Sequence, residues 1–346
     1  MDNKETLGLH SIRRWGAEIE ICSFDGIARG SNDKPPEGID HIGNFVREIT
    51  GDHVDIKGWQ LTHNNEGWVI KPDSSAGIEI CSPVFKGWGD LHKLCRLVEG
   101  FRQNDSVVAD NRCSFHLHAN IQEMNKEQRA KLIAYYIKCE PIFMDSVPFK
   151  RKTNKYCQLI GASQLISHDS PVDYDFLISS LGKTKYTSFN VFHLKNQHRD
   201  TCEFRIAECE ACTDPFFIKN WVKLLLHFIE RTQAFSLPPS YEKGNQWSSY
   251  LWFDLLDVLK LLGFDGKYNL SPACKQTRNW FLARLNENIL SEPSDIMWGI
   301  NSRKLAYNQL QKVIKQVEEE DGIPFSKEWL MPSNLEKSLY DEQYIR

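Results

Sequence analysis

Two glutamates lie two residues apart in the segment Gly16-Ala-Glu-Ile-Glu-Ile-Cys22. In a β-strand alternate residues point to the same side, so Glu18 and Glu20 would share one face and the apolar residues between them the other. Two neighbouring carboxylates repel each other unless a cation neutralises them. This spacing therefore favours a divalent-cation site on one face of a sheet.

Three further segments show the same alternation of polar and apolar residues. The polar positions are Glu79 in Gly77–Cys81, His116 and His118 in Ser114–Ile121, and Glu203 and Arg205 in Cys202–Ile206. A solvated face of an amphipathic antiparallel sheet would also explain the alternation. Such a face is usually rich in Thr, Lys, Ser and Gln, whereas these strands present mainly Glu, His and Arg, which favours a functional cluster. Carboxylate oxygens with one imidazole suit Mg²⁺ or Mn²⁺ better than Zn²⁺.

Composition excludes several functional classes. The net charge of -4 and pI near 6.3 argue against nucleic acid as the main partner. The N-terminal residues lack the apolar core of a signal peptide, and charged residues interrupt the longest apolar runs, so we expect a cytoplasmic protein without membrane insertion. We expect the ten cysteines to be reduced thiols without a disulfide framework. Cys209 and Cys212, with Cys202 nearby, are expected to pack in the interior and not to bind metal.

The periodicity along the chain predicts an α+β protein. Strands are expected at 16–22, 68–71, 77–81, 114–121, 188–194 and 202–207, separated by helices. One helix is expected to be capped by Asp90, another to follow Asn125, and a third to start at Asp214 and Pro215. A Pro- and Gly-containing break at 236–244 predicts a catalytic domain over 1–235 and a helical C-terminal extension over 236–346.

Neither a Walker-type phosphate loop nor a dinucleotide fingerprint occurs in the sequence. If the chain binds a nucleotide, the phosphates would therefore be held by metal ions and not by a glycine-rich loop at a helix terminus.

Four motifs, in this order, resemble those of the amidoligase family, which is related to glutamine synthetase and glutamate-cysteine ligase. They are Arg-Arg-Trp-Gly-Ala-Glu-Ile-Glu (13–20), Lys-Pro-Asp-Ser-Ser with Gly-Ile-Glu-Ile-Cys-Ser-Pro (71–83), Phe-His-Leu-His (115–118) and Cys-Glu-Phe-Arg (202–205). The segments Arg151–Cys157 and Tyr186–Asn190 lie between them. The resemblance covers roughly residues 13 to 232.

The resemblance implies a curved, mainly antiparallel sheet with helices on its convex face, as in glutamine synthetase, and a concave face that binds ATP and two or three Mg²⁺ or Mn²⁺ ions. It implies one metal held by Glu18, His116 and Glu203, and a second held by Glu20 and Glu79. We expect His118 to support the metal ligands and not to bind the metal itself, because the relatives usually have one imidazole per such site.

The implied reaction joins a carboxylate to an amine. The substrate carboxylate attacks the γ-phosphate to give an acyl phosphate, and the amine then displaces phosphate to leave an amide. Arg205 would contact the transferring phosphoryl group, Arg151 would bind a substrate carboxylate or phosphate, and Asp73 would bind the amine or accept its proton. Cofactor contacts are implied for Arg205, Lys185, Asn190 and His118.

Two positions depart from the family pattern. Lys185 stands where the family often has arginine, and Phe115 where many members have glycine. Lys185 keeps the charge but not the bidentate fork. A metal-dependent hydrolase and a non-catalytic nucleotide-binding relative are the alternative hypotheses. The sequence points to small-molecule or peptide carboxylate and amine substrates without identifying them, and it indicates no oligomeric state.

Overall fold

A computed structural model describes residues 6–9, 11–24, 27–28, 39–57, 66–160, 174–195, 200–235, 253–289 and 300–334. Its centre is an open eight-stranded sheet with the strand order β10-β11-β9-β2-β7-β6-β5, and β8 also pairs with β2. The pairs within it are antiparallel except β5–β6. The strands are β2 (Arg14–Ile21), β5 (Val54–Ile56), β6 (Trp68–Pro72), β7 (Ile78–Cys81), β8 (Phe85–Lys86), β9 (Ser114–Asn120), β10 (Phe189–Asn190) and β11 (Thr201–Glu208).

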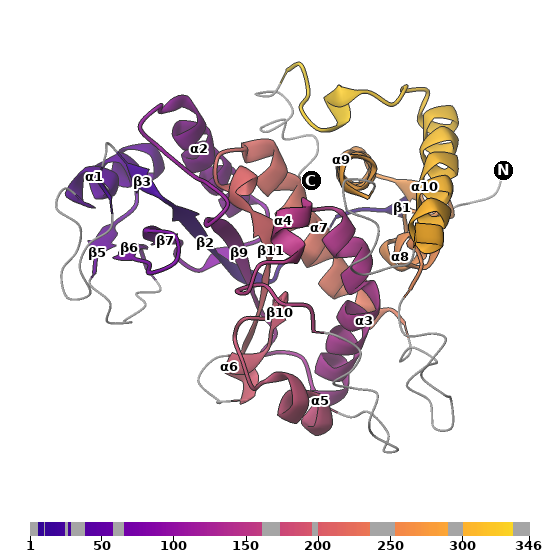
Figure 1. Ribbon diagram of the computed structural model, residues 1–346, viewed down its shortest axis with the longest axis horizontal. Coiled ribbons are helices and arrows are strands. Elements are labelled where there is room, and N and C mark those ends of the chain that lie inside the picture. Colours follow the sequence, from indigo (N-terminus) through magenta and orange to yellow (C-terminus); the bar gives the residue numbers. More distant parts are fainter. Residues whose placement is uncertain are drawn as a thin grey trace.

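Helices follow and separate these strands in the first part of the chain (Figure 1). They are α1 (Ile39–Thr50), α2 (Gly89–Gln103), α3 (Lys126–Asp145), α4 (Phe149–Lys152), α5 (Tyr174–Leu181), α6 (Phe192–Lys195), the short 3₁₀ turn η2 (Cys209–Cys212) and α7 (Pro215–Gln233). Two short strands, β3 (Ser23–Phe24) and β4 (Ile27–Ala28), pair with each other. The mixed α+β class expected from the sequence is confirmed, with a mainly antiparallel open sheet.

Apolar side chains of the central strands pack under the helices. On β2 Trp15, Ile19 and Ile21 are buried in the core. Phe204 of β11 lies with its ring centroid 5.7 Å from that of Tyr136 on α3, which also stacks on Phe189 of β10 at 4.5 Å. Since neighbouring residues of a strand point to opposite faces, this packing fixes Glu18, Glu20, Glu203 and Arg205 on the other face.

The long helices begin where the sequence places them, with one exception. Asn125 caps α3 through a capping box with Gln128, and Asp214 caps α7, which begins at Pro215. The expected cap at Asp90 is wrong, because α2 begins at Gly89 after Trp88. The Asp90 carboxylate instead accepts a hydrogen bond from the backbone N–H of Lys86, at 2.7 Å.

The predicted strand over 188–194 is also shorter than expected. Only Phe189 and Asn190 pair with β11, and Phe192–Lys195 forms α6. The Asn190 side-chain oxygen accepts a hydrogen bond from the Phe192 backbone N–H at 2.8 Å. This local turn, which competes with strand pairing, ends β10.

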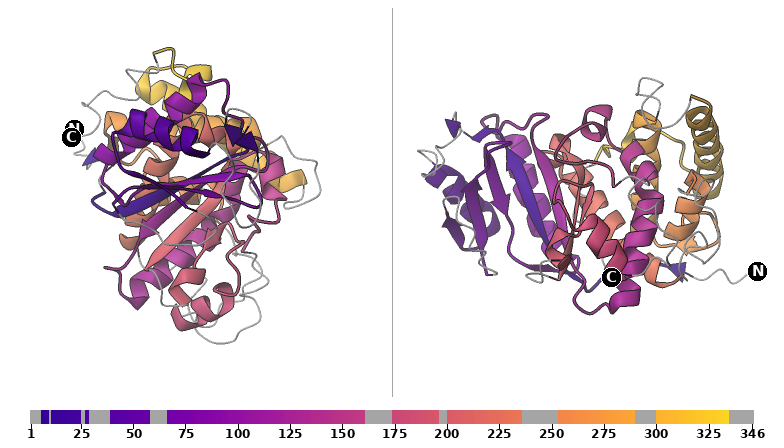
Figure 2. Two further views of the ribbon diagram at one scale, coloured as in Figure 1. Left: turned by 90° about the vertical axis from the view of Figure 1, so that its left-hand side faces the viewer. Right: turned by 60° about the horizontal axis from the view of Figure 1, so that its bottom comes forward.

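The rest of the described chain is mainly helical, with α8 (Leu255–Leu262), α9 (Pro272–Asn288), α10 (Ile300–Asp321), the 3₁₀ turn η4 (Lys327–Trp329) and the short strand β12 (Asn269–Leu270). Helices α8 and α9 pack against α7, and β12 pairs in parallel with β1 (Thr6–Leu7) near the start of the chain (Figure 2). Among the described helices none is long and apolar enough to cross a membrane. The expected boundary at 236–244 lies outside the described residues, and the division into two domains stays a prediction.

Candidate functional site

Four neighbouring strands bring the sequence-predicted acids and histidines onto one face of the sheet. In the central register Glu18 of β2 lies opposite His116 of β9, Glu20 lies opposite Glu79 of β7, and Glu203 of β11 lies opposite His118 of β9. Side chains directly opposite on neighbouring strands share a face and have their Cβ atoms about 5 Å apart. The sheet register therefore assembles one continuous cluster from residues far apart in sequence.

The first group in this cluster surrounds His116, which is almost completely buried. Its Nδ1 lies 3.1 Å from a Glu18 oxygen and 3.4 Å from a Glu203 oxygen. Glu18, His116 and Glu203 each offer a ligand atom, and these atoms all lie within 4.8 Å of one another. This is the set of three residues that the sequence resemblance assigns to one metal ion.

A second group forms beside the first, around the facing pair Glu20 and Glu79. Asp73 joins these two carboxylates, and one oxygen from each lies within 4.8 Å of the others. The Asp73 Oδ1 atom accepts hydrogen bonds from the backbone N–H groups of Ser75 and Ala76 and from the Ser75 hydroxyl. These bonds hold the carboxylate in place. The sequence assigned Asp73 to the amine, and the structure shows in addition that it can contribute an oxygen to this second group.

Burial and neighbouring charges shift the pKa values of the residues in and beside the first group. Burial opposes ionisation of Glu203, yet the charge of Arg205 lowers the Glu203 pKa to about 2. Burial likewise opposes the charged forms of Glu18 and His118, but their mutual attraction lowers the pKa of Glu18 and raises that of His118 to about 9. Burial and the charge of Arg205 lower the pKa of His116 to about 4. His116 is therefore neutral at pH 7, the form in which imidazole binds a metal.

The second group brings three carboxyl groups together, which opposes their ionisation. Burial, with the nearby carboxylates of Asp73 and Glu79, raises the pKa of Glu20 to about 8. Burial and the charge of Glu18 raise the pKa of Glu79 to about 7, although Lys71 Nζ lies 2.7 Å from its carboxylate. A cation bound here would relieve this repulsion.

Residues at the rim support the cluster. Asn190 is fully buried and donates from Nδ2 to Glu203 Oε2 at 2.6 Å. Arg205 donates to the other Glu203 oxygen, and its Nε donates to the Tyr156 carbonyl at 3.3 Å. Lys185 is exposed, with its ammonium group 5.4 Å from the centre of the Tyr186 ring. Of the predicted cofactor contacts, Arg205, Asn190 and His118 thus lie in the cluster, and Lys185 is outside the contacts that define it.

Arg151 extends from α4 to the same region. It is buried and donates to the backbone carbonyl of Arg205, and its charge acts on Glu20. Its Nε atom is buried without a hydrogen-bond partner in the described structure. Nε2 of His118, by contrast, lies 3.1 Å from a Glu18 oxygen. A buried donor without a partner is costly, so the Arg151 Nε atom is available to bind an oxygen ligand.

Two residues that support the cluster, Ser114 and Lys71, were not predicted from the sequence. The Ser114 hydroxyl donates to Glu20 Oε2 at 2.5 Å and lies 2.7 Å from His116 Nε2, so it links the two groups. Ser114 occupies the same strand face as His116 and His118, and the two-residue spacing that revealed the histidines could have revealed it. Lys71 is the second such residue. It is the one charged residue among the apolar residues of β6.

The donor set fits divalent metal ions. It consists of carboxylate oxygens and one neutral imidazole, arranged in two adjacent groups, with cations only at the margin. Oxygen-rich sets of this kind suit Mg²⁺ and Mn²⁺, which usually keep positions open for water or phosphate.

Comparison with known proteins agrees with the motifs. Residues 52–229, more than half of the chain, match the model of a family described as "Putative amidoligase enzyme". This match starts at residue 52, whereas the motifs noted in the sequence start at residue 13. Strand β2, with Glu18 and Glu20, therefore precedes the matched segment. The structure nevertheless pairs β2 with β9 and β7, which both lie inside the matched segment.

No curated protein sequence matches the chain. Among solved structures, the crystal structure of a bifunctional glutathione synthetase from Pasteurella multocida is similar, with 12% identity and a TM-score of 0.42. The alignment covers 89% of this chain and 53% of that one, so this chain spans about half the length of the synthetase. At this level the similarity does not establish a shared fold.

Proposed function

The chain belongs to the amidoligase family, and from this membership and the geometry of the site we propose that it is an ATP-dependent ligase that joins a carboxylate to an amine through an acyl phosphate. One observation carries the proposal: Glu18, His116 and Glu203 meet beside Glu20, Asp73 and Glu79 on a single sheet face. We further propose that this face corresponds to the concave, nucleotide-binding face of a glutamine synthetase-like fold.

In this proposal the two groups of side chains hold two divalent ions, with Glu18, His116 and Glu203 on one and Glu20 and Glu79 on the other. Asp73 lies beside the second ion and keeps its Oδ2 atom for the amine. Bound metal would neutralise the phosphate oxygens of ATP and the charge that develops on phosphoryl transfer. The remaining work falls to side chains that position the substrates, because phosphoryl transfer needs charge stabilisation more than a protein nucleophile.

Arg205 and Arg151 supply that positioning. Arg205 is oriented by Glu203 and by the Tyr156 carbonyl, which places its guanidinium beside the first metal group. The unpartnered Nε of the buried Arg151 lies in a position to donate to an oxygen of the substrate carboxylate or of the phosphoryl group. Planar guanidinium groups suit both ligands.

The reaction balances as two displacements. The substrate carboxylate oxygen forms a bond to the γ-phosphorus and ADP leaves. The amine then attacks the acyl carbon, phosphate leaves, and the proton lost by the amine passes to a base. Asp73 is the proposed base, or the group that binds the protonated amine before attack, because Oδ2 makes none of the bonds that hold Oδ1.

The test is release of ADP and phosphate from ATP with Mg²⁺ or Mn²⁺, scanned over pools of carboxylates and amines. Turnover should require both an acid and an amine. Carboxylate labelled with ¹⁸O should transfer one labelled oxygen to phosphate. Glu18→Gln and Arg205→Ala should each lower the rate by about 100-fold or more, whereas Glu99→Gln, in a partly buried ion pair with Arg102 on α2, should not.

Three results would contradict the proposal. Release of AMP and pyrophosphate would indicate an acyl adenylate. Hydrolysis of amides or esters without nucleotide would indicate a metal-dependent hydrolase. Phosphate release that needs neither acid nor amine, and that survives both substitutions, would exclude this site as the centre of the reaction.

A further inference from the structure

Two cysteine thiols meet where β2 ends and β9 begins. Cys22 directly follows β2, Cys113 directly precedes β9, and their Sγ atoms lie 3.2 Å apart. All ten cysteines of the chain lie in its described part as free thiols, and no other two of their sulfurs there are within hydrogen-bond distance. Both thiols of the pair are buried, with 7% of Cys22 and 1% of Cys113 exposed. This contact is the structural basis for a disulfide.

Backbone hydrogen bonds hold both cysteines in place. The Cys22 N–H donates to the Val108 carbonyl at 2.7 Å, and the Cys113 N–H donates to the Asp110 carbonyl at 2.8 Å. A disulfide needs its sulfurs about 2.05 Å apart, so these two have to approach each other by roughly 1.1 Å. Cys113 follows a turn at residues 111–112 and lies outside the paired part of β9, which leaves it room for this approach.

A metal ion is the other ligand that two adjacent thiols suggest. The Asp110 carboxylate offers a third donor, within 4.8 Å of both sulfurs. Both Asp110 oxygens, however, accept hydrogen bonds from Arg112 at 2.8 to 3.0 Å. A structural zinc ion needs four ligands, and the described residues add none to these three. The geometry therefore favours a disulfide over a bound metal.

The thiol pair is connected to the metal-binding face through its neighbours in sequence. Cys22 lies two residues after Glu20, and Cys113 directly precedes Ser114. The Ser114 hydroxyl donates to Glu20 Oε2 at 2.5 Å and lies 2.7 Å from His116 Nε2. Both contacts depend on the spacing between the end of β2 and the start of β9. A change in that spacing would therefore act on the second metal group.

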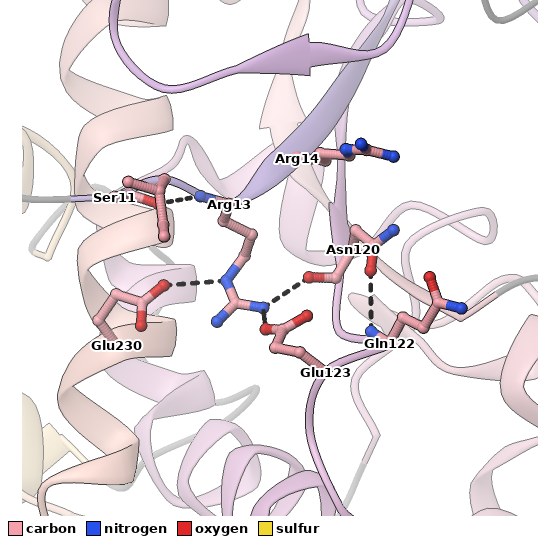
Figure 3. Close-up of a pocket in the computed structure, with 8 residues that line it drawn as sticks. Ser11, Arg13, Arg14, Asn120, Gln122, Glu123 and Glu230 are labelled. Carbon is pink, nitrogen blue, oxygen red and sulfur yellow. Dashed lines mark hydrogen bonds and ion pairs between the residues drawn. The ribbon is translucent and has the colours of Figure 1, made fainter.

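The opposite end of the same strand pair is fixed. In the pocket at the start of β2, Arg13 donates to the Asn120 carbonyl at 2.6 Å, to Glu230 of α7 at 2.9 Å and to Glu123 (Figure 3). These bonds hold the start of β2 to the end of β9 and to the helix beneath. A displacement at the thiol end is therefore not relieved by sliding β2 along β9, and it is taken up close to the thiols.

We propose that Cys22 and Cys113 form a reversible disulfide, and that this bond weakens metal binding at the second group. The oxidant is a peroxide. Each thiol gives up a proton and the pair gives up two electrons as the S–S bond forms; the O–O bond of hydrogen peroxide breaks, and two water molecules leave. A dithiol reverses the reaction by exchange and becomes a disulfide itself. The burial of both sulfurs favours this small oxidant over a bulky one such as oxidised glutathione.

The disulfide does not depend on the proposed ligase function, whereas its effect rests on the metal site of that proposal. The test compares full-length protein treated with hydrogen peroxide and the same protein treated with dithiothreitol, after both reagents are removed. Non-reducing peptide mapping by mass spectrometry should identify a bond between Cys22 and Cys113. Mn²⁺ titration followed by electron paramagnetic resonance should show the second ion bound about 10-fold more weakly after oxidation, an effect typical of disturbing a residue that supports a metal ligand. Dithiothreitol should restore the affinity.

Two variants complete the comparison. Cys22→Ser should form no disulfide and should keep the same Mn²⁺ affinity with and without peroxide. Cys209→Ser, which removes a more exposed thiol, is the matched control and should respond to peroxide as the wild type does. Because oxidised and reduced wild type are compared with each other, the result does not depend on either variant folding.

Peroxide-treated wild type without this bond, or with Cys113 bonded to a different cysteine, would overturn the proposal. So would a disulfide between Cys22 and Cys113 that leaves the Mn²⁺ affinity unchanged, or a metal ion that copurifies with the wild type and is lost in Cys22→Ser. Failure of the ligase function gives a different result. A protein whose second Mn²⁺ ion responds to oxidation as expected but that never consumes ATP would contradict the ligase function and confirm the disulfide switch.

Discussion

Glu18 and His116 face each other across β2 and β9, with 3.1 Å between Glu18 Oε2 and His116 Nδ1. A Glu203 oxygen from β11 lies 3.4 Å from the same nitrogen. These three residues are far apart in sequence and come from three adjacent strands. The register of the sheet, and not a flexible loop, therefore sets the spacing of the proposed metal ligands.

Glu18→Gln should weaken binding of the first Mn²⁺ ion by at least about 10- to 100-fold, because even residues that only support a ligand have effects of that size. Glutamine keeps the shape but removes the negative charge. Mn²⁺ electron paramagnetic resonance would measure the free and bound ion in a titration. Equal affinity of the variant and the wild type would exclude Glu18 as a ligand.

Metal binding should also stabilise the fold. At a Mn²⁺ concentration 100 times its dissociation constant, the free energy of unfolding should rise by about 2.7 kcal/mol. Glu20→Gln should lose the part of this gain that comes from the second ion. Without metal, the free energy of unfolding of this variant at pH 7 should be close to that of the wild type. Burial keeps Glu20 largely protonated at this pH, and glutamine resembles the protonated form. Urea unfolding with EDTA or with Mn²⁺ tests both statements, and an unchanged metal gain in Glu20→Gln would contradict the second site.

The alternation of residue types was enough to predict which side chains share the functional face. Glu18, His116 and Glu203 could be identified because each is flanked by apolar residues that the core requires, and a strand has only two faces. The same argument could not give their order across the sheet. That order depends on which strands pair, and pairing is determined by packing between distant segments.

Contacts without a local pattern were not predictable. The pairing of Arg14 with Lys86 depends on a two-residue strand, β8, that carries no periodic signal. Asn190 stops β10 through a hydrogen bond to its own turn, although its neighbours are strand formers. Arg284 of α9 reaches Glu208 at the end of β11 and Glu210 just after it, and nothing in the sequence links these segments.

Arg284 joins the C-terminal helices to the end of β11. Its side chain is buried, donates to Glu210 at 2.8 Å and lies 3.4 Å from Glu208 and 4.9 Å from the centre of the Phe217 ring. Arg284→Met should lower the free energy of unfolding by about 1–3 kcal/mol, less than for a fully buried pair because Glu210 is partly exposed. Chemical denaturation tests this, with Arg102→Met at an exposed ion pair as the control. An equal effect in both variants would contradict a bridging role.

Lys223 should make stability depend on pH. It is buried in α7 with no hydrogen-bond partner for Nζ in the described structure, and burial, with the charge of Lys219, lowers its pKa to about 7. The unfolded chain has a lysine pKa of about 10.4. Between these values the unfolded state binds more protons, so this group makes stability rise as the pH increases from about 7 to 10.

Lys223→Met should remove that rise and stabilise the protein at pH 7 by about 1–3 kcal/mol. Urea unfolding at pH 7, 8 and 9 measures both effects. Lys315→Met, at an exposed position of α10, serves as the control and should keep the wild-type pH dependence. The same pH dependence in Lys223→Met and the wild type would show that Lys223 is not buried as described.

The most direct test of the metal-binding face is anomalous X-ray scattering from crystals grown with MnCl₂ and ADP. We predict one manganese peak among the side chains of Glu18, His116 and Glu203, and a second among Glu20, Asp73 and Glu79. Manganese bound only elsewhere on the protein, with these six side chains bonded to one another or to water, would contradict the central claim.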